Sequence, residues 1–151
     1  MYLSAVQAPF GTLYILSDEE AICSVTTKDP GAAAGENEIS RQAAREISEY
    51  LAGKRTVFDV PVSPGRTDFQ RAVRRELLKI PYGETRSYQQ IAAAMERPSA
   101  VRAVGSAIGK NPVWILIPCH RVIGKNGKPV GYAGGLEMKK ALLELEGKTH
   151  F

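Results

Sequence analysis

Cysteine and histidine are scarce in this chain, and each occurs only twice among 151 residues. Neither cysteine stands in a metal-ligand spacing, so we expect no metal site and no cofactor. No hydrophobic run is long enough to span a membrane, and the segment Met1–Val6 lacks the basic and apolar regions of a signal peptide. We therefore expect a cytoplasmic protein that does not associate with membranes.

Negative charge is scarce in the second part of the chain. Residues 1–60 carry five Lys and Arg against nine Asp and Glu, a net charge of −4. Residues 61–151 carry fifteen against seven, a net charge of +8. This asymmetry suggests that the second part binds a polyanion such as nucleic acid. A basic surface that is merely solvated would give the same count, so charge alone leaves both explanations open.

The first part is predicted to be a small unit of strands and one helix. Short strands are expected at residues 1–8, 12–17, 21–28 and 56–60. Residues 38–51 have apolar side chains at helical spacing, and Gly53 is placed to end that helix. The segment 61–65, rich in proline and glycine, predicts a linker between domains 1–62 and 66–151.

The second part is predicted to be mostly helical. Thr67 and Gln70 form a capping-box signature at the start of one helix. Further helices are expected at residues 87–95, 100–108 and 136–146. The helices 87–95 and 100–108, joined by a tight turn, are typical of a helix-turn-helix, although such hairpins also occur in proteins that never bind DNA.

The helix 100–108 has an unusual outward face for a protein that reads bases. That face offers small side chains and one long one, Arg102. Reading the major groove requires several Asn, Gln or Arg side chains, so this helix is better suited to approach a shallow groove without sequence preference. Arg102 is then either a wedge that replaces an extruded base or an ordinary solvated charge.

The most informative segment runs from Asn111 to Val122. Residues 113–117 are rich in β-branched and aromatic residues and too few for a helix, so we expect an extended core segment that Pro118 ends. Cys119 then lies on a turn beside His120, and a nearby imidazole favours the reactive thiolate. From the Cys-His pair alone, a small buried hydrophobic residue is the alternative.

Glu146 closes the last predicted helix, where the helix dipole disfavours negative charge. A carboxylate at this place is explained if it orients a histidine. Otherwise Glu146 is a tolerated surface acid.

Together these segments resemble the O6-alkylguanine-DNA alkyltransferases, also called methylated-DNA–protein-cysteine methyltransferases. The resemblance runs from about Phe69 to Gly147, and Pro-Cys-His-Arg at 118–121 is its most specific word. The other matching segments are 83–84, 87–92, 102–105, 111–112, 131–136 and 142–147. The first part matches in outline only. The resemblance implies an α+β fold, in which a small ribonuclease-H-like domain precedes a mostly helical, winged-helix-like domain with a helix-turn-helix.

The resemblance also implies catalytic roles. The motif cysteine of the family accepts the alkyl group, and the histidine after it acts as a base through a water. The acid of the closing Leu-Glu-Gly segment orients that histidine. These roles fall on Cys119, His120 and Glu146. The tyrosine that gives a proton to the departing guanine, and contacts the phosphate of the flipped nucleotide, falls on Tyr88.

The remaining implied residues contact DNA or form the guanine pocket. Arg102 fills the gap left by the flipped nucleotide. The implied DNA contacts are Tyr88, Ser99, Arg102, Ala103 and Arg121, and the implied pocket residues are Asn111, Val122, Tyr132 and Ala133. Many relatives have Ser in place of Ala133, but the backbone N–H there still offers a hydrogen bond to O6. Relatives that bind zinc in the first domain have ligands that this chain lacks, and a sister group with Trp in place of Cys119 only binds lesions.

The implied activity is direct-reversal DNA repair. An alkyl group passes from O6-alkylguanine, and from O4-alkylthymine, in double-stranded DNA to Cys119, once per protein molecule. The resemblance also implies that the protein binds DNA as a monomer, through the minor groove. Cooperative binding along DNA is a further expectation.

Two other functions remain to be compared with this one. A Cys-His-Glu hydrolase would turn over through a thioester, but it leaves the helix-turn-helix and the charge asymmetry unexplained. A DNA-binding regulator would need base-reading side chains that the helix 100–108 does not offer.

Overall fold

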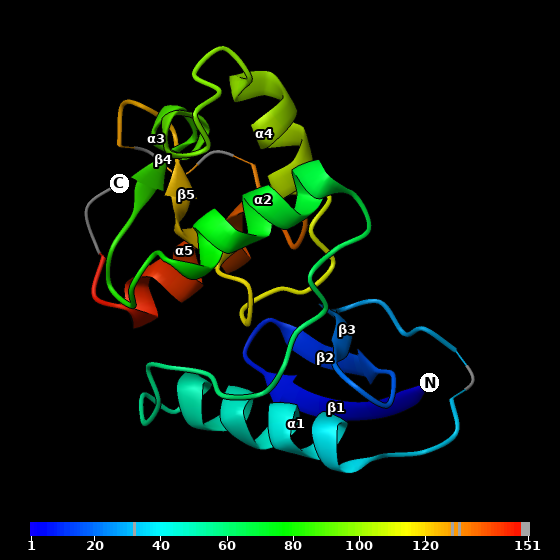
Figure 1. The fold of residues 1–151 in the computed structure, drawn as a ribbon. Helices are drawn as coiled ribbons and strands as arrows, with labels where there is room; N and C mark the ends of the chain where they lie inside the picture. The colour runs from blue at the N-terminus through cyan, green and yellow to red at the C-terminus, as the bar shows by residue number, and fades with distance from the viewer. Residues whose placement is uncertain (32, 128, 130, 149–151) are drawn as a thin grey trace. The chain divides into compact units, whose positions relative to one another are not determined.

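The computed structural model describes residues 1–31, 33–127, 129 and 131–148 (Figure 1). The chain forms two compact units. Unit 1 consists of residues 1–63 together with 112–116, and unit 2 consists of residues 64–111 and the chain from 117 onward. The chain therefore returns to unit 1 for one short segment before it completes unit 2.

Unit 1 is an antiparallel sheet with one helix packed on it (Figure 1). Its elements are β1 (Tyr2–Ala8), β2 (Gly11–Ser17), β3 (Ile22–Thr26) and α1 (Glu38–Leu51), with the strands in the order β1-β2-β3. Alternate residues of β2 are buried against α1, on which Ile47 and Tyr50 are fully buried. The three strands and the helix predicted here are confirmed. Asn37 caps α1 and forms a reciprocal capping box with Ser40.

The strand predicted over residues 56–60 is wrong, because a side chain satisfies this segment's backbone donors. Glu46 on α1 is 1% exposed and accepts hydrogen bonds from the backbone N–H of Asp59 (2.9 Å) and Val60 (3.1 Å). Sheet-like pairing occurs only after this segment, where Val62 makes a single parallel bridge to Ile22 of β3. The predicted linker 61–65 is therefore partly held against the sheet.

Unit 2 is mostly helical, and the helices predicted for it are confirmed. Its elements are α2 (Asp68–Leu78), β4 (Arg86–Ser87), α3 (Tyr88–Ala94), α4 (Val101–Gly109), the 3₁₀ turn η1 (Cys119–Arg121), β5 (Val122–Ile123) and α5 (Leu136–Leu145). Thr67 caps α2 by accepting from Gln70 N–H, but the Gln70 side chain accepts from Arg66 rather than completing a box. The complete capping box lies at α3, between Ser87 and Gln90.

The segment before Cys119 is buried as predicted, but it is not extended. Val113 makes one bridge to Val25, after which the chain turns sharply: Leu116 N–H donates to the Trp114 carbonyl at 2.8 Å, around an Ile115 φ of 71°. A β-branched residue in the left-handed region is strained, typically by about 1–3 kcal/mol, and persists only where its surroundings determine it. The prediction of an extended segment is wrong here, because the chain reverses at Ile115 despite the β-propensity of its residues.

A second tight turn presents Cys119 itself. Cys119 N–H donates to the Ile117 carbonyl at 2.7 Å around Pro118, and η1 then begins at Cys119. Within the described part of the chain, no helix has both the length and the apolar character needed to cross a membrane.

We predict that Glu46→Ala lowers the free energy of unfolding by about 2 kcal/mol, because two backbone N–H groups lose their acceptor. Burial raises the pKa of Glu46, but its hydrogen bonds with Gln42, Asp59 and Val60 outweigh burial and hold the pKa below its ordinary value of 4.5. The contribution of Glu46 is then present above pH 4.5 and is lost as pH falls through the lowered pKa. Urea denaturation at several pH values measures both effects.

Glu49→Ala is the matched control, because Glu49 lies on the same helix in a partly exposed ion pair with Arg55. We expect it to cost less than about 1 kcal/mol. Equal losses in the two variants at neutral pH would show that Glu46 does not hold the 59–60 backbone.

Candidate active site

Cys119 lies in the wall of a cavity of about 310 Å³ within unit 2. The cavity is lined by Tyr88, Gly105, Ile108, Gly109, Cys119, Gly131, Tyr132 and Ala133. Half of these residues are glycine or alanine, so backbone bounds much of the space. Among the described residues, no three His, Cys, Asp or Glu side chains come together where they could hold a metal ion.

A short parallel pairing brings Tyr88 to the cysteine turn. β4 and β5 lie side by side (Figure 1), with Arg86 opposite Val122 and Ser87 opposite Ile123. β5 directly follows η1, and β4 directly precedes α3, whose first residue is Tyr88. The pairing therefore fixes the start of α3 beside the turn that carries Cys119.

Burial dominates the electrostatics of the Cys119 thiol, which is 4% exposed. Burial raises the pKa of Cys119, while the Asn111 side chain, the positive charge of Lys139 and the Tyr132 side chain act in the opposite direction. Since the net pKa shift is upward, the group at rest near neutral pH is the thiol. The sequence led us to expect His120 as the group that favours the thiolate, whereas the structure adds Asn111, Tyr132 and Lys139 to that role.

His120 and Glu146 are in direct contact. Their side chains are fully buried, and His120 Nε2 lies 2.7 Å from Glu146 Oε2. An ionised carboxylate can only accept a hydrogen bond, so Nε2 carries the proton and Nδ1 carries the lone pair. Nδ1 is buried and makes no hydrogen bond to a described residue. Burial lowers the pKa of His120 below its ordinary value, so the neutral imidazole is available as a base.

Arg121 is not placed as the DNA contact that we expected. Its side chain is 7% exposed, with Nε 2.8 Å from Glu146 Oε1 and Nη2 3.1 Å from Glu146 Oε2. Its Nη1 donates to the Ile80 carbonyl at 2.7 Å. The guanidinium is thus used inside unit 2, because the Glu146 carboxylate and a helix-terminal carbonyl offer it bonds that desolvated charge requires.

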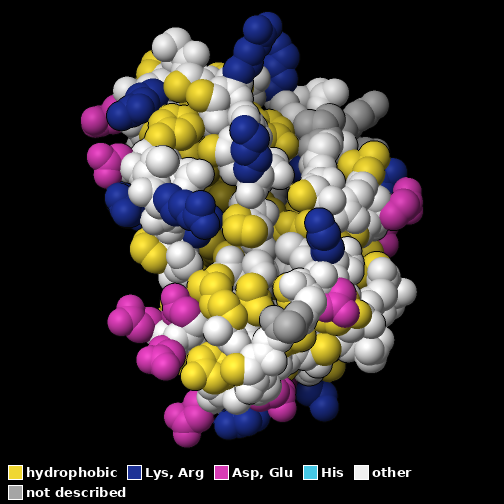
Figure 2. Space-filling view, turned by 90° about the vertical axis from the view of Figure 1, so that its right-hand side faces the viewer, with side chains coloured by type: hydrophobic (Ala, Val, Ile, Leu, Met, Phe, Trp, Pro, Cys, Tyr) yellow, Lys and Arg dark blue, Asp and Glu magenta, His cyan; other side chains and the backbone are white. Residues whose placement is uncertain are grey.

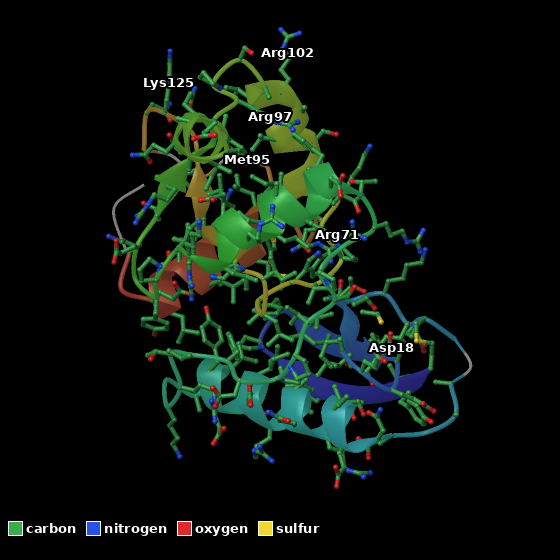
Figure 3. All side chains as sticks on the ribbon, viewed as in Figure 1. Asp18, Arg71, Met95, Arg97, Arg102 and Lys125 are labelled. Atoms are coloured by element: carbon green, nitrogen blue, oxygen red, sulfur yellow. The ribbon has the colours of Figure 1, made fainter. Side chains whose placement is uncertain are left out.

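The other predicted DNA contacts lie on the surface around α4. Ser99, Arg102 and Ala103 are exposed, and Figure 3 shows Arg102 pointing away from the ribbon near the start of α4. Tyr88 is half-buried in the cavity wall. Of the predicted pocket residues, Val122 and Asn111 are buried, Tyr132 is half-buried and Ala133 is exposed.

Lys139 was not predicted from the sequence, although a signal was present. Lys139 precedes Leu142 and Leu143 by three and four residues, and this spacing puts a lysine on the buried face of α5. Its side chain is fully buried and donates to the Gly131 carbonyl at 3.1 Å. A charged residue on an apolar helical face is the observation that identifies it.

Comparisons with known proteins agree across both parts of the chain. The model of a family described as "6-O-methylguanine DNA methyltransferase, ribonuclease-like domain" matches residues 1–64, and that of the "DNA binding domain" with the same name matches residues 68–148. A methylated-DNA–protein-cysteine methyltransferase of Methanosarcina acetivorans is 43% identical over 154 residues, covering 97% of this chain and 99% of its own. The inducible enzyme of that name from Bacillus subtilis is 60% identical over 103 residues, covering 68% of this chain and 58% of its own. A crystal structure of Mycobacterium tuberculosis OGT in complex with DNA is 40% identical, with a TM-score of 0.88 over 97% of this chain and 92% of that one.

We predict that Glu146→Gln lowers the free energy of unfolding by about 3 kcal/mol, because it leaves the Arg121 guanidinium buried without its countercharge. Chemical denaturation at neutral pH measures the loss. Glu144→Gln is the matched control, since Glu144 is exposed on the same helix and its replacement should stay within about 0.5 kcal/mol. Denaturation midpoints that coincide for the two variants would rule out the proposed support.

Proposed function

Since the chain belongs to the 6-O-methylguanine DNA methyltransferase family, we propose that Cys119 is the acceptor in its direct-reversal DNA repair reaction. The protein transfers an alkyl group from O6-alkylguanine in DNA to a cysteine and leaves guanine restored. The observation that carries the assignment is the placement of Cys119 in a cavity wall that also contains Tyr88, one residue before a His120 that is held by Glu146.

The target base must leave the duplex to reach Cys119. The alkyl carbon on O6 lies inside the stack, and enzymes that act on such atoms flip the nucleotide into a pocket. The exposed small residues Ser99, just before α4, and Ala103, on α4, suit this region to a close approach in the minor groove. Arg102 projects from the same helix, where it can fill the gap in the stack (Figure 3).

Positive charge is scattered over the molecular surface that Figure 2 shows. Lys and Arg side chains occur at several places on this face, among uncharged and acidic side chains, and form no single continuous patch. Residues 61–151 carry a net charge of fifteen minus seven, or +8. Separate cations neutralise phosphates along a backbone without reading sequence, so DNA binding is strongly salt-dependent.

The proton transfers follow from the hydrogen-bond geometry. The Cys119 thiol gives its proton, through a water, to the His120 Nδ1 lone pair. The thiolate attacks the alkyl carbon, so that an S–C bond forms, the C–O6 bond breaks and the electron pair stays on guanine. Tyr88 supplies a proton to the departing base, and the backbone N–H of Ala133 stabilises the charge that develops on O6. Asn111 keeps the sulfur oriented through its hydrogen bond to Cys119.

Arg121 has a role in this scheme that differs from DNA contact. It occupies both oxygens of the carboxylate that also orients His120. The positive charge of Arg121 lowers the pKa of His120, which burial has already lowered. His120 therefore holds the cysteine proton only transiently, and Arg121 serves mainly to fix Glu146.

Further parts of the proposal concern substrates, assembly and location. O4-alkylthymine presents the same exocyclic O-alkyl group and is a second substrate. The protein acts as a monomer, and the opposite net charges of residues 1–60 and 61–151 favour cooperative binding by successive copies on DNA. It acts in the cytoplasm, where a catalytic thiol stays reduced.

We predict strict stoichiometry, because the thioether formed at Cys119 has no carbonyl that water can attack. Incubation with duplex containing O6-methylguanine should repair at most one lesion per protein, and intact mass should show one added methyl group on Cys119. Cys119→Ser should abolish transfer, whereas Cys23→Ser should retain it. Continued repair beyond one equivalent would contradict the assignment and favour the Cys-His-Glu hydrolase.

We predict that Arg102→Ala slows repair of duplex DNA by about tenfold or more, since it removes the side chain that stabilises the flipped state, which costs a few kcal/mol to form. Reaction with free O6-benzylguanine, which needs no flipping, should be unchanged. Arg71→Ala removes another cation of unit 2, partly exposed and paired with Asp68, and controls for charge. An equal loss on both substrates would mean that Arg102 supports the fold or the pocket.

A further inference from the structure

Lys139 is a buried cation at the cavity that the reaction scheme above does not use. Its side chain is fully buried, and its Nζ lies 3.1 Å from the Gly131 carbonyl and 6.0 Å from the centre of the Tyr88 ring. Both of these residues line the cavity that contains Cys119. The ammonium therefore lies directly behind the cavity wall, beside Tyr88.

The location of Lys139 is unfavourable for a merely structural lysine. Burial in an apolar helical face disfavours its charge. Lys139 also lies in the first turn of α5, where its N–H bonds to the Gly135 carbonyl and where the helix dipole disfavours a cation. The fold therefore retains a positive charge beside this cavity although both burial and the helix dipole disfavour it.

The charges that act on Lys139 come from the reacting groups. Burial lowers the pKa of Lys139 to about 8, and the charge of Cys119 opposes that shift. Lys139 in turn lowers the pKa of Cys119 and of His120, which face it from η1. The ring of Tyr88 faces it from α3, and the Tyr132 side chain, in the loop before α5, lowers the pKa of Cys119 as well. At neutral pH, below a pKa of about 8, Lys139 remains mostly charged.

We propose that Lys139 is the counter-cation of the transfer reaction and stabilises negative charge first on Cys119 Sγ and afterwards on the departing guanine and Tyr88. This inference rests on the proposed function. Before attack, the cysteine proton is on His120 and the negative charge is on sulfur. As the S–C bond forms and the C–O6 bond breaks, the charge moves to guanine, which takes the Tyr88 proton and leaves a tyrosinate beside the ammonium. Tyr88 then regains the proton held by His120, and Lys139 keeps its own proton throughout.

The first test measures the ionisation of Cys119 without any DNA or repair chemistry. Iodoacetamide alkylation of Cys119 is followed against pH by peptide mass, which separates it from Cys23. Lys139→Met should raise the apparent midpoint by about one pH unit or more, because an opposite charge beside a thiol shifts it by this order. Lys139→Arg should restore the midpoint, and Lys140→Met, the next residue on the same helix, should leave it unchanged.

The second test separates the stabilisation of the leaving group from that of the thiolate. Iodide, the leaving group of iodoacetamide, needs no proton from Tyr88. The loss of alkylation rate that Lys139→Met causes with iodoacetamide at neutral pH, about tenfold, therefore reports the thiolate alone. The loss with free O6-benzylguanine should be larger. In a Tyr88→Phe background, where no tyrosinate forms, this excess loss should shrink to the part that reports charge on the departing guanine.

The outcomes separate this inference from the proposed function. An unshifted midpoint in folded Lys139→Met, or in Lys139→Gln if the first variant melts, overturns the thiolate role. An excess loss that is undiminished with Tyr88→Phe overturns the tyrosinate role. A wild-type protein that reacts with iodoacetamide but gives no benzyl adduct with O6-benzylguanine contradicts the proposed function, whereas the iodoacetamide comparison still decides the role of Lys139 at Cys119.

Discussion

The Glu146 carboxylate is the constraint on which the architecture of unit 2 depends. It accepts from His120 and Arg121 of η1, and from the backbone N–H of Gly83 at 3.2 Å. Gly83 has a φ of 79°, and a Cβ there would lie 3.3 Å from the Glu146 carbonyl, so the approach of that loop requires glycine. One carboxylate at the end of α5 therefore fixes the cysteine turn and the loop after α2 together. Tyr82 strengthens the same junction by donating to the Leu145 carbonyl.

Local signals in the sequence were sufficient for the helices, but not for the segments whose shape is decided by distant groups. Caps such as Thr67 and Ser87 lie within three residues of the donors they satisfy, so the pattern is readable. The turn around Ile115 is not the conformation that its β-branched residues favour locally, and it occurs in a segment that is fully surrounded by other residues. The failure over 56–60 has the same origin, since Glu46 supplies acceptors that no strand pattern reveals.

The chemistry of the site was predictable to a similar extent. The roles of Cys119, His120 and Glu146 were implied by the family resemblance. The structure places His120 and Glu146 in direct contact. The burial of Arg121 could not be read from a basic residue beside a reactive cysteine, because both a phosphate and an internal carboxylate would suit it. Lys139 could have been found, since its spacing from Leu142 places it on an apolar stripe. A charged side chain is rarely kept buried on an apolar helical face unless it has a functional role.

Because residues 112–116 return to unit 1, a single cut in the gene cannot separate the two units cleanly. A gene fragment that ends at the segment 61–65 encodes a sheet whose strand β3 lacks its bridge to Val113. The complementary fragment contains a strand-pairing segment with nothing to pair. The two parts are therefore not interchangeable cassettes, and recombination at their apparent boundary would exchange an incomplete module. We therefore expect substitutions in residues 112–116 and in their partners in unit 1 to occur together in evolution, as they do on the two sides of an obligate interface.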